Sequence, residues 1–224
     1  MKNKFQNITR VVSAAMLVSL LAIAPQQIMA KGAPVKEKKK GKVTVFADGW
    51  QELKPVEGEQ QIGNFTCISL KGEPKQAANK KWTSAWGNWT VNGTDGAAKR
   101  GVIMVPGKVV NDDWLVSEEI NLEDCKKPLL QIDGYSKYGT DKGNDLKILI
   151  SEDYNGDVEA AHWDELWMES FHKENQAVER AISLKKYQGR KVVIAFRSIH
   201  SGKSLKNLTR TTFLSKVEVK AVKK

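Results

Sequence analysis

Short apolar runs separated by turn residues make up most of the chain after residue 42. In residues 129–135 apolar and polar side chains alternate, whereas residues 192–198 are almost continuously apolar. Runs of this length, closed by Gly, Asn, Asp or Ser, are typical of strands in antiparallel sheets. We therefore expect about ten strands, at residues 43–46, 64–70, 102–105, 114–117, 129–135, 145–150, 163–168, 177–184, 192–198 and 211–222.

The order of these runs predicts an all-β fold with very little helix, a two-sheet antiparallel β-sandwich of the jelly-roll type. Residues 139–144 are polar and Gly-rich, so we expect the strands on either side of them to form a hairpin. Residues 74–101 are the least regular segment. No glycine-rich nucleotide-binding motif and no alternation of strands with helices are present.

The first 30 residues have the pattern of a secretory signal peptide. Lys2, Lys4 and Arg10 precede an apolar run, and small residues end the segment at Ala30. We expect cleavage near Ala30, although an uncleaved anchor is the alternative. Residues 31–42 then form a Lys-rich linker, and residues 43–224 form the sandwich domain. The mature protein is expected outside the cell, in the periplasm or at the cell surface, with no stable membrane span.

The chain carries a formal net charge of +10. Removal of the signal peptide takes away three positive charges and no negative ones, which leaves +7. The excess lies mostly near the two ends, rather than on an aromatic-rich folded face, which argues against nucleic acid as a partner. Salt-sensitive attraction to anionic polymers or lipid head groups is more consistent with this distribution.

The two cysteines, Cys67 and Cys125, have different surroundings. Export would permit a Cys67–Cys125 disulfide. Cys67 lies in an apolar strand and Cys125 in a polar turn, so we favour two separate thiols over the bridge. Neither has the histidine neighbours of a zinc site.

Three segments in order resemble the bacterial extracellular jelly-roll domains called choice-of-anchor J, and the related secreted domains of unknown function of the DUF5017 type. The segments are residues 114–122 (Trp-Leu-Val-Ser-Glu-Glu-Ile-Asn-Leu), residues 148–156 (Ile-Leu-Ile-Ser-Glu-Asp-Tyr-Asn-Gly, followed by Ala-x-Trp-x-x-Leu at 161–166) and residues 182–196. The resemblance implies a secreted jelly roll at the bacterial cell surface.

The resemblance also bears on a structural calcium ion, because related jelly rolls hold one with two acidic residues. Asp48 matches the first of these positions, but Ser215 stands at the second. Family members also usually have Pro where this chain has Glu118. The calcium is therefore not a firm expectation, and we expect no other cofactor.

Candidate ligand-binding residues are mainly aromatic, because a flat ring stacks well on the apolar face of a sugar. Trp82, Trp86 and Trp89 lie in the irregular segment and form the proposed stacking surface, with Tyr135, Tyr138 and Arg197 as polar neighbours. Packing of these tryptophans into the core is the alternative. The other strand-borne tryptophans, Trp114, Trp163 and Trp167, are expected to pack.

No nucleophile, base and acid are arranged for catalysis, and 26 acidic residues will always supply some chance pair. We therefore predict a non-catalytic module that binds a glycan at the bacterial cell surface or outside the cell. The alternatives are a structural or adhesive envelope protein that binds another protein through a sheet face and, less favoured, a glycan hydrolase.

Overall fold

The structure is a computed structural model, and it describes residues 41–50, 61–71, 86–92, 94, 98–104, 110–137, 144–169, 176–201 and 211–224. The chain divides into two units, Met1–Lys38 and Lys39–Lys224, and every described residue belongs to the second. Among the described residues no helix is long and apolar enough to cross a membrane.

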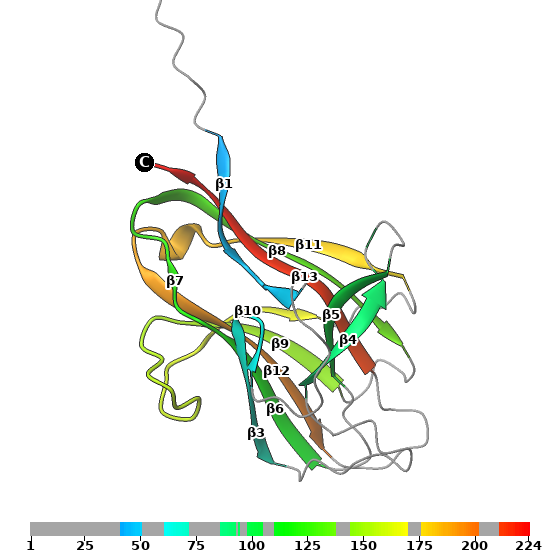
Figure 1. The fold of residues 1–224 in the computed structure, drawn as a ribbon. Helices are drawn as coiled ribbons and strands as arrows, with labels where there is room; N and C mark the ends of the chain where they lie inside the picture. The colour runs from blue at the N-terminus through cyan, green and yellow to red at the C-terminus, as the bar shows by residue number, and fades with distance from the viewer. Residues whose placement is uncertain are drawn as a thin grey trace, which may run out of the picture. The chain divides into compact units, whose positions relative to one another are not determined.

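The described residues form thirteen strands and one 3₁₀ turn (Figure 1). In chain order these are β1 Lys42–Ala47, β2 Gln61–Ile62, β3 Phe65–Lys71, β4 Trp86–Asn92, β5 Ala98–Met104, β6 Val110–Ser117, β7 Ile120–Asn121, β8 Cys125–Lys137, β9 Asn144–Ser151, β10 Asp164–Glu169, β11 Val178–Ser183, η2 Lys185–Tyr187, β12 Lys191–Ser201 and β13 Thr211–Lys223.

The strands build two antiparallel sheets that face one another. Sheet A has the order β11-β8-β13-β5-β4, with β1 also paired to β13. Sheet B has the order β10-β9-β12-β6-β3-β2, with β7 also paired to β12. The predicted all-β sandwich is therefore confirmed.

Two sequence predictions about connections and turns are wrong. The strands on either side of residues 139–144 do not form a hairpin, because β8 belongs to sheet A and β9 to sheet B. Alternation shows that each strand has one buried face, but it does not say which strand is its neighbour. Cys125 is not in a turn, but is the buried first residue of β8.

The segment predicted to be irregular contains strand β4 and the first part of β5, which pair with each other from Trp86↔Met104 to Asn92↔Ala98. Gly101 explains why β5 is difficult to recognise. A Cβ atom at Gly101 would lie 2.2 Å from the carbonyl oxygen of Leu214 in β13. The close approach of the two strands thus requires glycine, a residue that sequence patterns associate with turns rather than strands.

The core between the sheets is apolar and rich in aromatic rings. Phe65 lies at its centre, with ring centroids 5.5 Å from Phe46, 5.5 Å from Trp50 and 6.1 Å from Phe196. Trp50, Phe65 and Phe196 are at most 1% exposed. Truncating one such ring to alanine typically costs about 3–5 kcal/mol, so this cluster is a main source of the sandwich's stability.

Candidate functional site

The loop between β9 and β10, residues 152–163, is held in place by its own polar side chains. The carboxylate of Asp153 accepts hydrogen bonds from the Ser151 hydroxyl (2.8 Å) and from the backbone N–H of His162 (2.9 Å). The carboxylate of Asp157 accepts bonds from the N–H groups of the next turn, at 2.9 and 3.3 Å. These bonds are those of a polar turn.

This ordered loop places aromatic rings on the outer face of sheet B. The Trp163 ring centroid lies 5.3 Å from Trp114 of β6 and 5.6 Å from Tyr154. The indole N–H of Trp163 donates to the carbonyl of Val158 at 3.0 Å, which fixes the orientation of the ring. Trp114 is buried, whereas Tyr154 and Trp163 remain half-exposed.

Arg197 of β12 completes this surface. Its guanidinium lies over the Trp114 ring, 4.6 Å from the centroid. Nε and Nη2 donate to the two carboxylate oxygens of Asp112, at 2.8 and 2.6 Å. These bonds to Asp112 raise the pKa of Arg197 above its usual value, so the side chain stays charged.

The arrangement of Tyr154, Trp163, Trp114, Arg197 and Asp112 is called here the aromatic–arginine surface. The Arg197 side chain is 30% exposed, and within the part of the chain that the structure describes Nη1 has no hydrogen-bond acceptor. A ligand could therefore contact the exposed parts of Tyr154 and Trp163 and a fixed hydrogen-bond donor on the same face of sheet B. Apolar faces with a few well-placed polar groups are the usual composition of ligand sites.

Those predicted ligand-binding side chains that the structure describes, namely Trp86, Tyr135 and Arg197, lie in three different places. Trp86 is 3% exposed and belongs to the core between the sheets, which fits the packing alternative. Tyr135 is also buried, stacked on Phe213 with centroids 4.4 Å apart in a cluster separate from that core. Trp89 pairs with Gly101 through the backbone. Trp82 and Tyr138 lie outside the described residues.

Asp48 binds backbone groups, and its surroundings do not fit a calcium ion. One carboxylate oxygen accepts the N–H of Trp50 at 3.0 Å and the other accepts the N–H of Val217 at 2.8 Å. Burial raises the pKa of Asp48, and these two hydrogen bonds oppose that rise. The Ser215 hydroxyl donates instead to the carbonyl of Asp133. Asp48 thus ties the end of β1 to β13.

Metal-ligating and sulfur groups are dispersed in the part of the chain that the structure describes. There no three His, Cys, Asp or Glu side chains gather in a way that could hold a metal ion. Cys67 and Cys125 are free thiols. Burial raises the pKa of Cys67 to about 12, so its sulfur stays protonated.

A polar group that the sequence analysis missed lies on the inner side of β6. Asp113 and Asn111 are each 1% exposed, and the Asn111 amide donates to Asp113 Oδ2 at 2.5 Å. Asn111 Oδ1 and Asp113 Oδ1 are buried without a hydrogen-bond partner. Desolvation, only partly offset by hydrogen bonds from Ser69 and Asn111, raises the pKa of Asp113 to about 6.

Comparison with known proteins supports the fold rather than a family. No family model matches the chain, and no curated protein matches it in sequence. The K1 cleaved adhesin domain of Lys-gingipain from Porphyromonas gingivalis W83 is similar in structure, with a TM-score of 0.52, 14% identity, and coverage of 79% of this chain and 97% of that one. The module TmCBM61, solved in complex with beta-1,4-galactotriose, has a TM-score of 0.48, 10% identity, and coverage of 79% and 97%.

At these identities the likeness shows a shared β-sandwich and nothing finer. The resemblance to choice-of-anchor J domains therefore stays a prediction. Of the aromatic–arginine surface, the sequence analysis named only Arg197 as a binding residue. Trp114 and Trp163 were expected to pack, and they do so on the outer face of sheet B, where Trp163 keeps one part of its ring in solvent. Trp167 was also expected to pack, and this prediction is wrong, because Trp167 is 48% exposed.

Proposed function

We propose that this protein is an exported, non-catalytic binding module that recognises a glycan through the aromatic–arginine surface. The observation that carries the proposal is that Trp163 and Arg197 both lie against Trp114 on the outer face of sheet B, with Tyr154 against Trp163. Sugar rings present apolar C–H faces to aromatic rings and hydroxyl groups to a donor such as Nη1 of Arg197. The adhesin domain of similar fold is consistent with a role in attachment.

The geometry of the loop favours binding over a purely structural role. Asp153, Asp157 and the Val158 carbonyl already fix the loop through hydrogen bonds, and Val158 packs under it. Rings held this firmly lose little side-chain entropy when a ligand docks, and such preorganisation increases affinity.

A glycan array followed by titration calorimetry tests the proposal. The variant Trp163→Ala should lower affinity for the bound glycan by at least about tenfold, the scale of a well-placed aromatic contact. Trp167→Ala is the matched control, because Trp167 is 48% exposed on β10 and has no ring partner among the described residues. It should bind as the unmodified protein does.

Two further measurements keep the test decisive. Arg197→Lys retains the positive charge but loses the paired bonds to Asp112, and it should weaken binding while leaving the fold intact by circular dichroism. If no glycan on the array binds, or if both tryptophan variants bind as well as the unmodified protein, the proposal is wrong.

An alternative function is adhesion to another protein, and the exposure of the Trp167 side chain favours it. β10 is an edge strand of sheet B, and its pairing with β9 shifts register between Glu165 and Trp167. A bulge of this kind discourages strand addition at an edge, so a partner would contact the Trp167 side chain rather than the backbone. Loss of surface attachment in Trp167→Ala, but not in Trp163→Ala, would support this alternative.

A further inference from the structure

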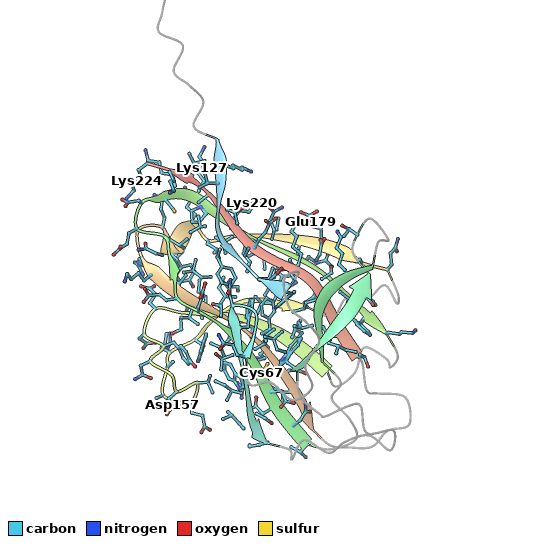
Figure 2. The ribbon with its side chains drawn as sticks, in the orientation of Figure 1. Cys67, Lys127, Asp157, Glu179, Lys220 and Lys224 are labelled. Atoms are coloured by element: carbon cyan, nitrogen blue, oxygen red, sulfur yellow. The ribbon has the colours of Figure 1, made fainter. Side chains whose placement is uncertain are left out.

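Lysines from several parts of the sequence gather at one end of sheet A. β1 and β13 run antiparallel, so Lys42 lies opposite Val222 and next to the end of the chain. Val222 also pairs with Lys126, and Lys223 pairs with Cys125. Figure 2 shows Lys127, Lys220 and Lys224 at this same end.

The 3₁₀ turn η2 brings a further lysine to this end. The N–H of Leu184, which precedes the turn, donates to the carbonyl of Pro128 at 2.9 Å. The backbone N–H of Lys127 donates to the side chain of Gln188 at 3.0 Å, just after the turn. Lys185 therefore lies close to Lys127. The following set is called the lysine end: Lys42, Lys126, Lys127, Lys185, Lys223 and Lys224.

The side chains of the lysine end have no acidic partners among the described residues. All six side chains are exposed, and within the described parts of the chain none forms an ion pair with a carboxylate. Lys224 Nζ donates to the carbonyl of Glu123. Elsewhere Lys147, Lys186 and Lys191 lie 3.0, 2.6 and 3.0 Å from a carboxylate.

The acids nearest in sequence do not neutralise this charge. Glu123 and Asp124 precede β8, which against six lysines leaves four positive charges. Glu218 is held between Lys216 and Lys220, at 3.0 and 2.7 Å. Unpaired like charges repel one another, and an anionic partner would relieve that repulsion.

The backbone at Lys127 is a second, independent feature of this end. Its φ of 52° is the only positive value among the described residues other than glycine. Side-chain-bearing residues seldom adopt this conformation. Strained backbone of this kind tends to be retained at functional positions, and here it forms the bend that carries a lysine into the lysine end.

We propose that the lysine end binds an anionic polysaccharide, one that carries sulfate, phosphate or carboxylate groups. A membrane surface is less suitable, because stable membrane attachment usually combines charge with inserted apolar groups. The large exposed apolar side chains among the described residues are Val110, at the start of β6, and Trp167, in β10. Neither belongs to the lysine end, which lies on a different sheet from both. The site is separate from the aromatic–arginine surface and does not depend on it.

The test compares two triple variants of the full chain that change net charge equally. The first is Lys126→Gln, Lys223→Gln and Lys224→Gln. The control is Lys71→Gln, Lys147→Gln and Lys191→Gln. Lys71 ends β3 in sheet B, and the side chains of Lys147 and Lys191 face the carboxylates of Glu165 and Glu119. Binding to heparin and to alginate is measured by titration between 0.05 and about 0.3 M NaCl, with neutral dextran as the blank.

We expect the first variant to lose at least about tenfold in heparin affinity at 0.15 M NaCl, and its slope of log K against log salt to fall by about three. The control should lose less than about twofold. Circular dichroism and thermal unfolding check that both variants fold.

Equal losses in the two variants would show that net charge alone matters, and would overturn the proposal. So would binding to vesicles that contain phosphatidylserine without binding to heparin or alginate. A failure on the glycan array does not bear on this result, since that array tests Trp163 and Arg197.

Discussion

Asp113 should make the protein less stable as the pH rises from 4 to 7, and the variant Asp113→Asn should remove that dependence. The carboxyl is buried at 1% exposure, and burial raises its pKa from 3.8 to about 6. Asparagine has nearly the same shape, cannot ionise, and still offers an oxygen to the Asn111 amide.

The size of the effect follows from the shift of about two pKa units. Each unit corresponds to about 1.4 kcal/mol, so ionising Asp113 in the folded protein costs about 3 kcal/mol more than ionising it in the unfolded chain. Between pH 4 and 6 the native state still holds the proton that the unfolded state has lost. The contribution of Asp113 to the free energy of unfolding is therefore intact below pH 4, falls as the pH rises to 6, and is constant above that.

Urea unfolding of both proteins at pH 4, 5, 6 and 7 measures this contribution. The difference between the two free energies of unfolding should change by about 3 kcal/mol over the range, in favour of Asp113→Asn at higher pH. Asp124→Asn removes the same charge at an exposed site and is the control. A difference for Asp113→Asn that stays constant within about 0.5 kcal/mol would refute the reasoning.

Three further variants or reagents test other contacts. Asp48→Ala leaves two buried backbone N–H groups without an acceptor and should lower the free energy of unfolding by about 2–5 kcal/mol in urea titrations; a loss below about 0.5 kcal/mol would contradict its role as a backbone tie. Gly101→Ala places a Cβ atom against a backbone oxygen of β13 and should reduce the melting temperature by several degrees, whereas an unchanged melting temperature would mean that the strands can separate locally. Cys125 is buried and Cys67 half-buried, and both thiols have raised pKa values, so Ellman's reagent should detect neither at pH 8 and both in urea; a thiol count of zero in urea would indicate a disulfide.

The strands were predictable because burial of a strand face produces a recognisable pattern of apolar residues in the sequence. The runs at 192–198 and 211–222 correspond to β12 and β13 to within a few residues. Pairing was less predictable, since β8 and β9 have similar alternation but bury their apolar faces from opposite sheets. Strand β4 was missed because its sequence, Trp-Gly-Asn-Trp-Thr-Val-Asn, contains several residues that are common in turns.

The candidate site was less predictable than the fold. Trp114 and Arg197 are far apart in sequence, but they lie directly opposite each other where β6 pairs with β12. The position of Asp113 on the inner face of β6 could have been predicted from the sequence. Leu115 is a core residue, and counting back two positions along a strand places Asp113 on the same inner face. A carboxyl predicted on a core face is the kind of exception that deserves a functional or energetic explanation.

β13 occupies the middle of sheet A, with β8 along one side and both β5 and β1 along the other (Figure 1). A chain that is still emerging from the ribosome lacks this strand until the residues from 211 onward are free. Until then β1, β5 and β8 have no common neighbour, and their unpaired edges are open to aggregation. Sheet A should consequently form only once β13 is available, and removal of residues 211–224 should abolish the folded state rather than merely shorten the sheet.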